Sequence, residues 1–240
     1  MIRWMAACAM LTFLGACNDV VVSSAPTSTG PTSAVRDVPD QLGNRDATLR
    51  AFVNVVQRVE PVAERECRAR TNGVNCDFSI RVDERRNQPP NAFQTLDENQ
   101  RPIVVFTLTL LEEARNADEI AFVMGHEAAH HIRGHIARQK ENAVAGAVIF
   151  GGLASLTGGG AGAIESAQRI GAQVGARSYS KEFELEADAL GTVITVRAGY
   201  DPVAGAEFFN RIPDPGDRFL GTHPPNAQRI DTVRRTAAGL

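Results

Sequence analysis

Four of the chain's five histidines fall within residues 126–135, and two of them belong to a motif that could hold a metal ion. His126, Glu127 and His130 form the pattern HExxH. Positions four residues apart share one face of a helix, so both imidazoles can reach one zinc ion while Glu127 reaches a water molecule beside it. A carboxylate in that place suits general-base work on the water. The motif therefore predicts a hydrolytic zinc site.

A catalytic zinc site takes three protein ligands and keeps one position open, so a third ligand must come from elsewhere in the chain. The segment 181–188 offers two carboxylates, Glu184 and Asp188, which are four residues apart and would share a helix face. One could bind the metal while the other accepts a hydrogen bond from the far ring nitrogen of a ligating histidine. The spacing leaves both assignments open, and in isolation the segment would be a solvent-exposed acidic stripe.

Length and composition indicate one globular domain without a nucleic-acid partner. The chain has 240 residues, of which 43% are apolar and 22% charged, and its formal net charge is −3. A chain of this length can bury one sizeable core. The slightly acidic balance provides no basic surface for a phosphate backbone, so we expect no nucleic acid among the partners.

The N-terminus has the features of a bacterial lipoprotein signal. Residues 4–16 follow Arg3, carry no charge and form an apolar run of the length of a signal h-region. The run ends in Leu-Gly-Ala-Cys, which resembles the lipobox that is cleaved before an acylated cysteine. We expect a signal peptide at 1–16, a lipid on Cys17 and a flexible tether at 17–45. A plain secretory signal is the alternative.

These features predict a protein of the bacterial cell envelope, lipid-anchored and facing the periplasm. The outer membrane is favoured, although Asp19 leaves the inner membrane open. Cys67 and Cys76 are nine residues apart with a turn signal between them. Because the compartment is oxidising and their spacing suits a zinc site poorly, we expect a disulfide between them.

The folded domain is expected to span 46–240, with a small sheet in its first half. Apolar residues recur at helical spacing from Leu49 to Val59, so a first helix should stop near Pro61 or continue to Arg70. Apolar and polar residues alternate over 77–83, which predicts a half-buried strand, and two further short strands are expected at 91–96 and 103–106.

Helices should dominate after Thr107. Asn116, with Glu119 three residues later, has the pattern of a capping box that opens a helix through HExxH to about Glu141. Residues 143–164 contain no charge but seven glycines. Their length would suit a transmembrane span, whereas the glycines favour a turn between two helices, with a membrane-facing apolar tip as a variant.

HExxH followed by a later ExxAD, here Glu184 to Asp188, resembles the gluzincin family of bacterial zinc peptidases that includes BepA, LoiP and HtpX. The CAAX prenyl proteases and the mitochondrial Oma protease are its eukaryotic relatives. The resemblance covers most of 88–230 and includes His135 and the segment 222–224. Two positions depart from the usual pattern, His131 and Lys181.

The resemblance implies a role for each member of the zinc site. His126, His130 and Glu184 would bind one Zn²⁺ ion per chain, and Glu127 would be the general base. Asp188 would support a ligating histidine from behind. The fold implied is α+β, a mainly helical zincin-type metallopeptidase domain with a small β-sheet. One helix would carry HExxH and a second would carry ExxAD.

Two residues near the C-terminus complete the implied site. His223 and Arg229 would face the tetrahedral intermediate of the reaction, where a cation or N–H donor stabilises developing negative charge. The proline pair that follows His223 would hold its imidazole still. Alternatively, His223 would bind the metal in a latent enzyme.

The expected function is that of a membrane-anchored periplasmic zinc endopeptidase. The resemblance implies quality control of unfolded or misassembled envelope proteins, which would bind as an extended strand near 91–96. One alternative is a catalytically silent zinc-binding lipoprotein that binds envelope partners. Another is a zinc-buffering protein, which only the clustered histidines favour.

Overall fold

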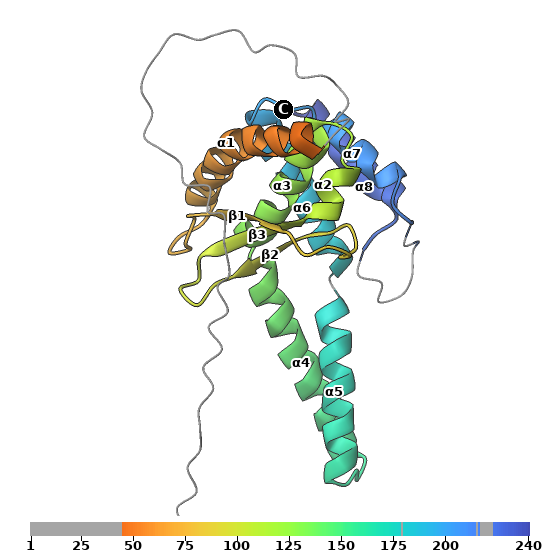
Figure 1. The fold of residues 1–240 in the computed structure, drawn as a ribbon. Coiled ribbons are helices and arrows are strands. Elements are labelled where there is room, and N and C mark those ends of the chain that lie inside the picture. The colour runs from red at the N-terminus through yellow and green to blue at the C-terminus, as the bar shows by residue number, and fades with distance from the viewer. Residues whose placement is uncertain (1–44, 179, 215, 217–222) are drawn as a thin grey trace, which may run out of the picture.

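The computed structural model describes residues 45–178, 180–214, 216 and 223–240, which form a small sheet packed against a group of helices (Figure 1). The expected signal peptide, Cys17 and all but the last residue of the expected tether lie outside this part of the chain. The prediction of a mainly helical fold with a small sheet is confirmed. Two helices, α4 (His135–Leu156) and α5 (Ala161–Ser178), lie side by side and project away from the body.

The three predicted strands form one mixed sheet with the order β1-β3-β2. The central strand β3 (Pro102–Thr107) runs parallel to β1 (Ser79–Asp83) and antiparallel to β2 (Ala92–Leu96). Phe106 of β3 packs edge-on against Phe52 of the first helix, with 5.3 Å between the ring centroids. The sheet is thereby joined to the helical core through its central strand.

The first helix, α1 (Arg45–Arg70), continues through Pro61 and is the longer of the two helices expected from the sequence. Pro61 is exposed, whereas Val55, Val59 and Val62 are buried in the core. Burying each of these side chains contributes about 1.5–3 kcal/mol, which together exceeds the roughly 3 kcal/mol that a proline costs inside a helix. Tertiary packing therefore decides where this helix ends.

The helix that carries HExxH, α3 (Ala117–Ile132), is shorter than the sequence predicts. Its predicted N-cap is confirmed, since the side chain of Asn116 accepts a hydrogen bond from the backbone N–H of Glu119. The predicted extension to about Glu141 is wrong. Gly134 adopts a φ of 67° and separates α3 from α4. Left-handed backbone costs glycine little, so this residue stops the helix.

The predicted turn between two helices is present, but it lies later than the first glycines suggest. Gly151 and Gly152 remain inside α4, and the chain reverses between Leu156 and Ala161. None of the helices that the structure describes combines the length and the hydropathy of a membrane span.

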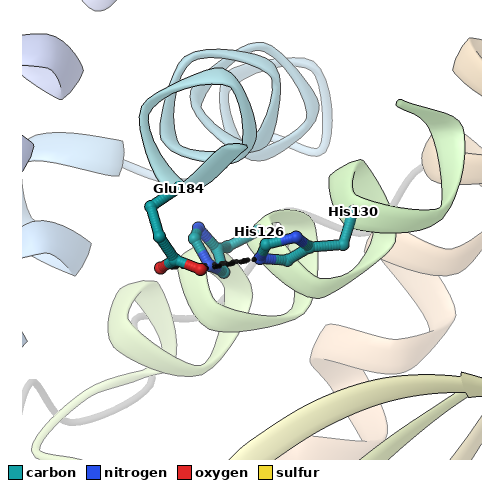
Figure 2. Close-up of side chains that lie close together, drawn as sticks. All are labelled: His126, His130 and Glu184. Carbon is teal, nitrogen blue, oxygen red and sulfur yellow. Dashed lines mark hydrogen bonds and ion pairs between the residues drawn. The ribbon is translucent and has the colours of Figure 1, made fainter. Parts of the chain in front are cut away.

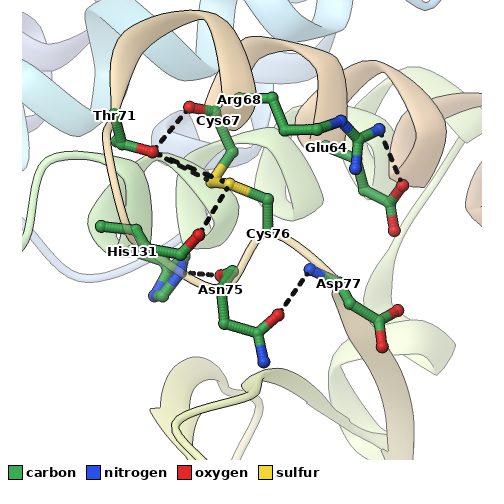
Figure 3. The surroundings of a disulfide bond; sticks show 9 residues. Glu64, Cys67, Arg68, Thr71, Asn75, Cys76, Asp77 and His131 are labelled. Atoms are coloured by element: carbon green, nitrogen blue, oxygen red, sulfur yellow. Dashed lines mark hydrogen bonds and ion pairs between the residues drawn. A yellow bond between two sulfur atoms is a disulfide. The ribbon is translucent and has the colours of Figure 1, made fainter.

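A disulfide between Cys67 and Cys76 closes the loop that follows α1, with 5.7 Å between the two Cα atoms (Figure 3). His131 of α3 lies against this loop, because its Nε2 atom is 2.7 Å from the carbonyl oxygen of Asn75. The ring of His131 also packs edge-on against Phe78, with centroids 5.4 Å apart. This departure from the family pattern therefore fastens the active-site helix to the disulfide loop.

The helix α6 (Ser180–Arg197) crosses α3 at a point where each of the two helices has a glycine. A Cβ atom on Gly191 would lie 2.8 Å from the backbone nitrogen of His126, and one on Gly125 would lie 2.9 Å from the Gly191 carbonyl oxygen. Larger residues would push the helices apart, so this crossing sets the distance between the two helices that carry the site.

The other helices of the described residues are α2 (Leu108–Glu113), α7 (Pro202–Ala206), the 3₁₀ helix η1 (Glu207–Asn210) and α8 (Asn226–Ala238).

Candidate metal centre

Two histidines of α3 and one glutamate of α6 bring their polar atoms together (Figure 2). The Nε2 atoms of His126 and His130 are 3.0 Å apart. One carboxylate oxygen of Glu184 is 3.6 Å from Nε2 of His126, and the other is 3.4 Å from Nε2 of His130. The two carboxylate oxygens face different histidines, and each pair of side chains brings ligand atoms to within 3.0–3.6 Å, so the three side chains form a nearly equilateral ligand triangle.

The size of this triangle fits a zinc ion. Tetrahedral coordination with bonds of about 2.0–2.1 Å places neighbouring ligand atoms about 3.3 Å apart. The three observed separations, 3.0, 3.4 and 3.6 Å, lie on either side of that value. Two imidazoles and one carboxylate also form the donor set of one known type of catalytic zinc site. Both the chemistry and the spacing of the donors therefore suit this metal.

His126 is oriented by a buried carboxylate behind it. Its Nδ1 atom lies 2.9 Å from Oδ1 of Asp188, which is fully buried. Arg229 of α8 holds the same carboxylate with two hydrogen bonds of 2.8 and 2.6 Å, and its guanidinium lies 4.0 Å from the ring centre of Phe209. When Nδ1–H of His126 donates to Asp188, the lone pair of Nε2 points into the triangle.

His130 is oriented by a different chain of contacts. Its Nδ1 atom lies 2.8 Å from Nδ1 of His135, and Nε2 of His135 lies 3.2 Å from a carboxylate oxygen of Glu186. Arg138 holds Glu186 with hydrogen bonds of 2.7 and 3.2 Å. The ring of Phe183 stacks on His135 with 4.6 Å between centroids. This chain fixes the second histidine as Asp188 fixes the first.

The sequence spacing did not predict that Glu186 supports His130 through His135. Glu186 lies on a different face of α6 from Glu184, so it was not expected to take part in the site. The break at Gly134 brings the start of α4, with His135 and Arg138, to that other face. A histidine five residues after HExxH and just after a glycine is the one signal in the sequence that could have pointed to it.

Replacing His135 with alanine is expected to weaken zinc binding by about 10–100-fold, because partners of metal-bound histidines typically contribute that much to affinity. Competition with a chromophoric chelator would measure the affinity. His131→Ala is the matched control, since it removes an imidazole from the same region without touching His130. Equal affinities in the two variants would show that His135 does not position the metal ligand.

Burial and neighbouring charges set the protonation of the two histidines. Burial and the nearby His126 lower the pKa of His130 to about 3, so its imidazole is neutral at pH 7 and has a lone pair for a metal. Burial opposes a charge on His126 too, but hydrogen bonds with Asp188 and Glu184 raise its pKa to about 9. A metal that binds His126 therefore displaces a proton, and binding should weaken as the pH falls.

Glu127 faces a cavity of about 780 Å³ between α3 and β2. Burial raises the pKa of its carboxyl group to about 7, and the charge of Glu184 contributes in the same direction. The backbone N–H of Gln94 on β2 interacts with this carboxylate and opposes the rise. A carboxyl group with a pKa near neutrality is well matched to accept and return a proton at pH 7.

The two C-terminal members of the predicted site have different surroundings. His223 lines the same cavity, and its side chain is 53% exposed, with Nδ1 3.1 Å from a carboxylate oxygen of Glu184. Arg229 is only 6% exposed, and its guanidinium donates two hydrogen bonds to the carboxylate of Asp188. One of its nitrogens also lies 3.4 Å from Glu184. Of the two, His223 is the residue accessible to a ligand in the cavity.

A helix with HExxH, a carboxylate from a second helix and a cavity bordered by a β-strand define a metallopeptidase of the zincin type. Residues 52–237 match peptidase family M48, and the chain belongs to that family. The resemblance seen in the sequence is thereby confirmed. The prediction of a metalloendopeptidase is confirmed at the level of the family.

Several curated proteins are similar to the chain over most of its folded part. It is 30% identical over 167 residues to the beta-barrel assembly-enhancing protease of Yersinia pestis, an alignment that covers 63% of the chain and 33% of the relative. Against the protein of the same name from Escherichia coli K12, identity is 28% over 173 residues, with the same coverage of 63% and 33%. The mitochondrial metalloendopeptidase OMA1 of Arabidopsis thaliana is 28% identical over 131 residues, covering 53% of the chain and 26% of the relative. The chain thus spans about a third of the length of the bacterial relatives it matches.

Proposed function

We propose that the chain is a zinc-dependent endopeptidase that hydrolyses unfolded or misassembled proteins of the bacterial envelope. The observation that carries this proposal is the triangle of His126, His130 and Glu184, with Glu127 beside it at the edge of an open cavity. A site that only stored zinc or held the fold together would gain nothing from a carboxylate with a raised pKa facing that cavity.

The residues of the site divide the work of hydrolysis. His126, His130 and Glu184 would hold zinc, which when bound polarises the scissile carbonyl and lowers the pKa of a water molecule. Glu127 accepts the proton of the attacking water and passes it to the nitrogen of the leaving amine. No covalent bond forms between the chain and the substrate.

His223 has two possible roles that follow from its place. Across the cavity it can donate a hydrogen bond to the oxygen on which negative charge develops. In its observed position His223 instead contacts Glu184, so its imidazole covers one side of the metal site. We propose that this contact belongs to a resting enzyme and that His223 moves to the substrate during the reaction. Arg229 supports both states by holding Asp188 in place.

The strand β2 offers a place for an extended substrate. It is an outer strand of the sheet beside β3, and its residues 92–94, with Asn91 just before it, line the cavity next to Glu127. A peptide that pairs with an outer strand is recognised mainly through its backbone. Such binding favours segments that are already unfolded, and it fits the name of the bacterial relatives, which refers to the assembly of β-barrels.

The proposed location is the periplasmic side of a membrane, preferably the outer one, with a lipid on Cys17. Support comes from the lipobox-like sequence before Cys17 and from relatives named for β-barrel assembly. The substrates would then reach the site before they are inserted or folded.

Cleavage of reduced, unfolded casein by the purified chain tests the proposal. We expect cleavage that is lost after treatment with 1,10-phenanthroline and restored by about one equivalent of zinc per chain. The products would be followed by gel electrophoresis and mass spectrometry. A zinc-loaded chain that leaves casein intact would contradict the catalytic role, and cleavage that survives removal of the metal would contradict the zinc mechanism.

A further inference from the structure

The hairpin of α4 and α5 projects from the body of the protein (Figure 1). It exposes large apolar side chains over most of its outer length. Within the described residues, few other large apolar side chains are as exposed. Five of the hairpin's large apolar side chains lie on α4 and are between 62% and 88% exposed, namely Val144, Val148, Ile149, Leu153 and Leu156. A sixth, Ile170, lies on α5.

The hairpin is held together by its small residues rather than by these large ones. A Cβ atom on Gly146 would lie 2.0 Å from the carbonyl oxygen of Gly171, and one on Gly175 would lie 2.0 Å from that of Asn142. Helices in water normally bury large apolar side chains against each other. Close contact through glycines, with the large side chains outside, is typical of helix pairs in lipid.

The exposed apolar surface is wide and of limited length. At about 100° per residue, the five side chains of α4 spread over roughly half the circumference of the helix, the half that faces away from α5. A helix that binds in a protein groove uses a narrower stripe at positions i, i+3, i+4 and i+7. From Val144 to Leu156 the surface extends about 18 Å, slightly more than one leaflet of a bilayer whose apolar core is about 30 Å thick.

The charges of the hairpin complement an anionic surface. Residues 143–164 carry none. Exposed Lys140 and Arg177 lie near the base, at about the same level, since Asn142 packs against Gly175. Arg138 is paired with Glu186 of α6, which leaves Lys140, Arg169 and Arg177 against Glu141 and Glu165 on the two helices. The hairpin therefore carries a net charge of +1 in a chain whose total is −3. Basic residues next to an apolar surface are attracted to the headgroups of anionic lipids.

The outer face of α5 shows which side of the hairpin would stay in water. Glu165 and Arg169 form an exposed ion pair on it, and exposed Gln173 follows one turn later. The hairpin is therefore apolar on the α4 side as far as Leu156, uncharged at its tip, and polar on the face of α5 that carries Glu165, Arg169 and Gln173. This asymmetry suits a hairpin lying in the interface of a bilayer rather than crossing it.

We propose that the α4–α5 hairpin docks on an anionic phospholipid bilayer through the outer face of α4 and the tip of the hairpin. With the lipid on Cys17 that is part of the proposed function, the chain allows this docking. The 28 residues 17–44 can span at most about 90–100 Å, well beyond the roughly 33 Å length of α4. α4 begins at His135, whose ring contacts His130. Docking would thus fix the height and orientation of the metal site above the membrane.

Tryptophan fluorescence tests this proposal with the full chain, which has a single tryptophan at position 4. In a Trp4→Phe background, Leu156→Trp places a reporter on the apolar side, and Gln173→Trp places a matched one on the polar side. With vesicles of phosphatidylethanolamine and phosphatidylglycerol, we expect the emission of Leu156→Trp to shift to shorter wavelength and to be quenched by brominated acyl chains. The emission of Gln173→Trp should stay that of a tryptophan in water.

The outcomes separate lipid from other occupants. Adding Ile149→Lys and Leu153→Lys to the reporter should remove the shift without changing casein cleavage in solution, since neither residue lies near the site. A Leu156→Trp reporter that remains in water while the protein floats with the vesicles would overturn the proposal. So would a shift without lipid that coincides with a doubled mass, because a second copy would then cover the hairpin. The emission can be read equally in a Glu127→Gln protein, so failure of the docking is distinguishable from failure of the proposed catalysis.

Discussion

Replacing Glu127 with glutamine is expected to lower the rate of casein cleavage by about 10²–10⁴-fold, the usual contribution of a general base, while zinc stays bound. Glutamine has nearly the size of glutamate but cannot accept the proton of the attacking water. The carboxylate of Glu127 is not part of the ligand triangle, so the metal should be retained. Initial rates of cleavage and zinc content per chain, measured on the same preparation, check both halves of the expectation.

The control for this variant is Glu182→Gln, which removes an exposed carboxylate from α6 outside the site. It should cleave casein at the rate of the unaltered chain. Cleavage that persists in Glu127→Gln would exclude this residue as the base. Loss of zinc from Glu127→Gln would instead show that the residue holds the metal, which the observed geometry does not suggest.

The local part of the site could be predicted from the sequence because it depends on helix geometry alone. His126 and His130 are four residues apart, so any helix through them places both imidazoles on one face. The cap at Asn116 likewise depends only on neighbouring residues. The strand positions also followed from local patterns, namely the alternation of apolar and polar residues in β1 and the short segments that became β2 and β3.

Features that depend on how distant segments pack were not accessible in this way. The helix stop at Gly134 had a local signal, but the polar and apolar pattern that continues to Glu141 concealed it. The glycines within α4 read as a turn, whereas Gly146 and Gly151 serve the close contact with α5. The partner of Arg229 could not be predicted either, because only the packing of α8 against α6 shows that its guanidinium is hydrogen-bonded to Asp188.

The packing of α6 against α3 also distinguishes the roles of Glu184 and Asp188, which their spacing in the sequence left open. Glu184 points its oxygens toward the Nε2 atoms of both histidines, at 3.6 and 3.4 Å. Asp188 contacts the opposite nitrogen of His126 and is fully enclosed between that ring and Arg229. Glu184 is therefore the metal ligand in our proposal, and Asp188 is its supporting residue.

Replacing Glu184 with alanine is accordingly expected to weaken zinc binding by roughly 100-fold or more, because a direct ligand contributes at least as much as the partners of ligands do. The fold should remain, since Asp188, Arg229 and His126 keep their mutual contacts. Asp188→Asn should have the complementary effect. It removes the carboxylate charge that holds the buried Arg229 through two hydrogen bonds and leaves only the more distant Glu184, at 3.4 Å. Breaking a buried ion pair costs about 3–5 kcal/mol of stability.

Two measurements on both variants test this expectation: the zinc affinity, by competition with a chelator, and the free energy of unfolding, by urea denaturation. The expected result is a large loss of affinity with a small loss of stability for Glu184→Ala, and a large loss of stability for Asp188→Asn. Full zinc occupancy in Glu184→Ala would remove this residue from the ligand set. If Asp188→Asn instead lost its zinc while remaining as stable as the unaltered chain, Asp188 would be the metal ligand and Glu184 the supporting residue. The crossing of α3 and α6 at Gly125 and Gly191 would then have to differ from the one described.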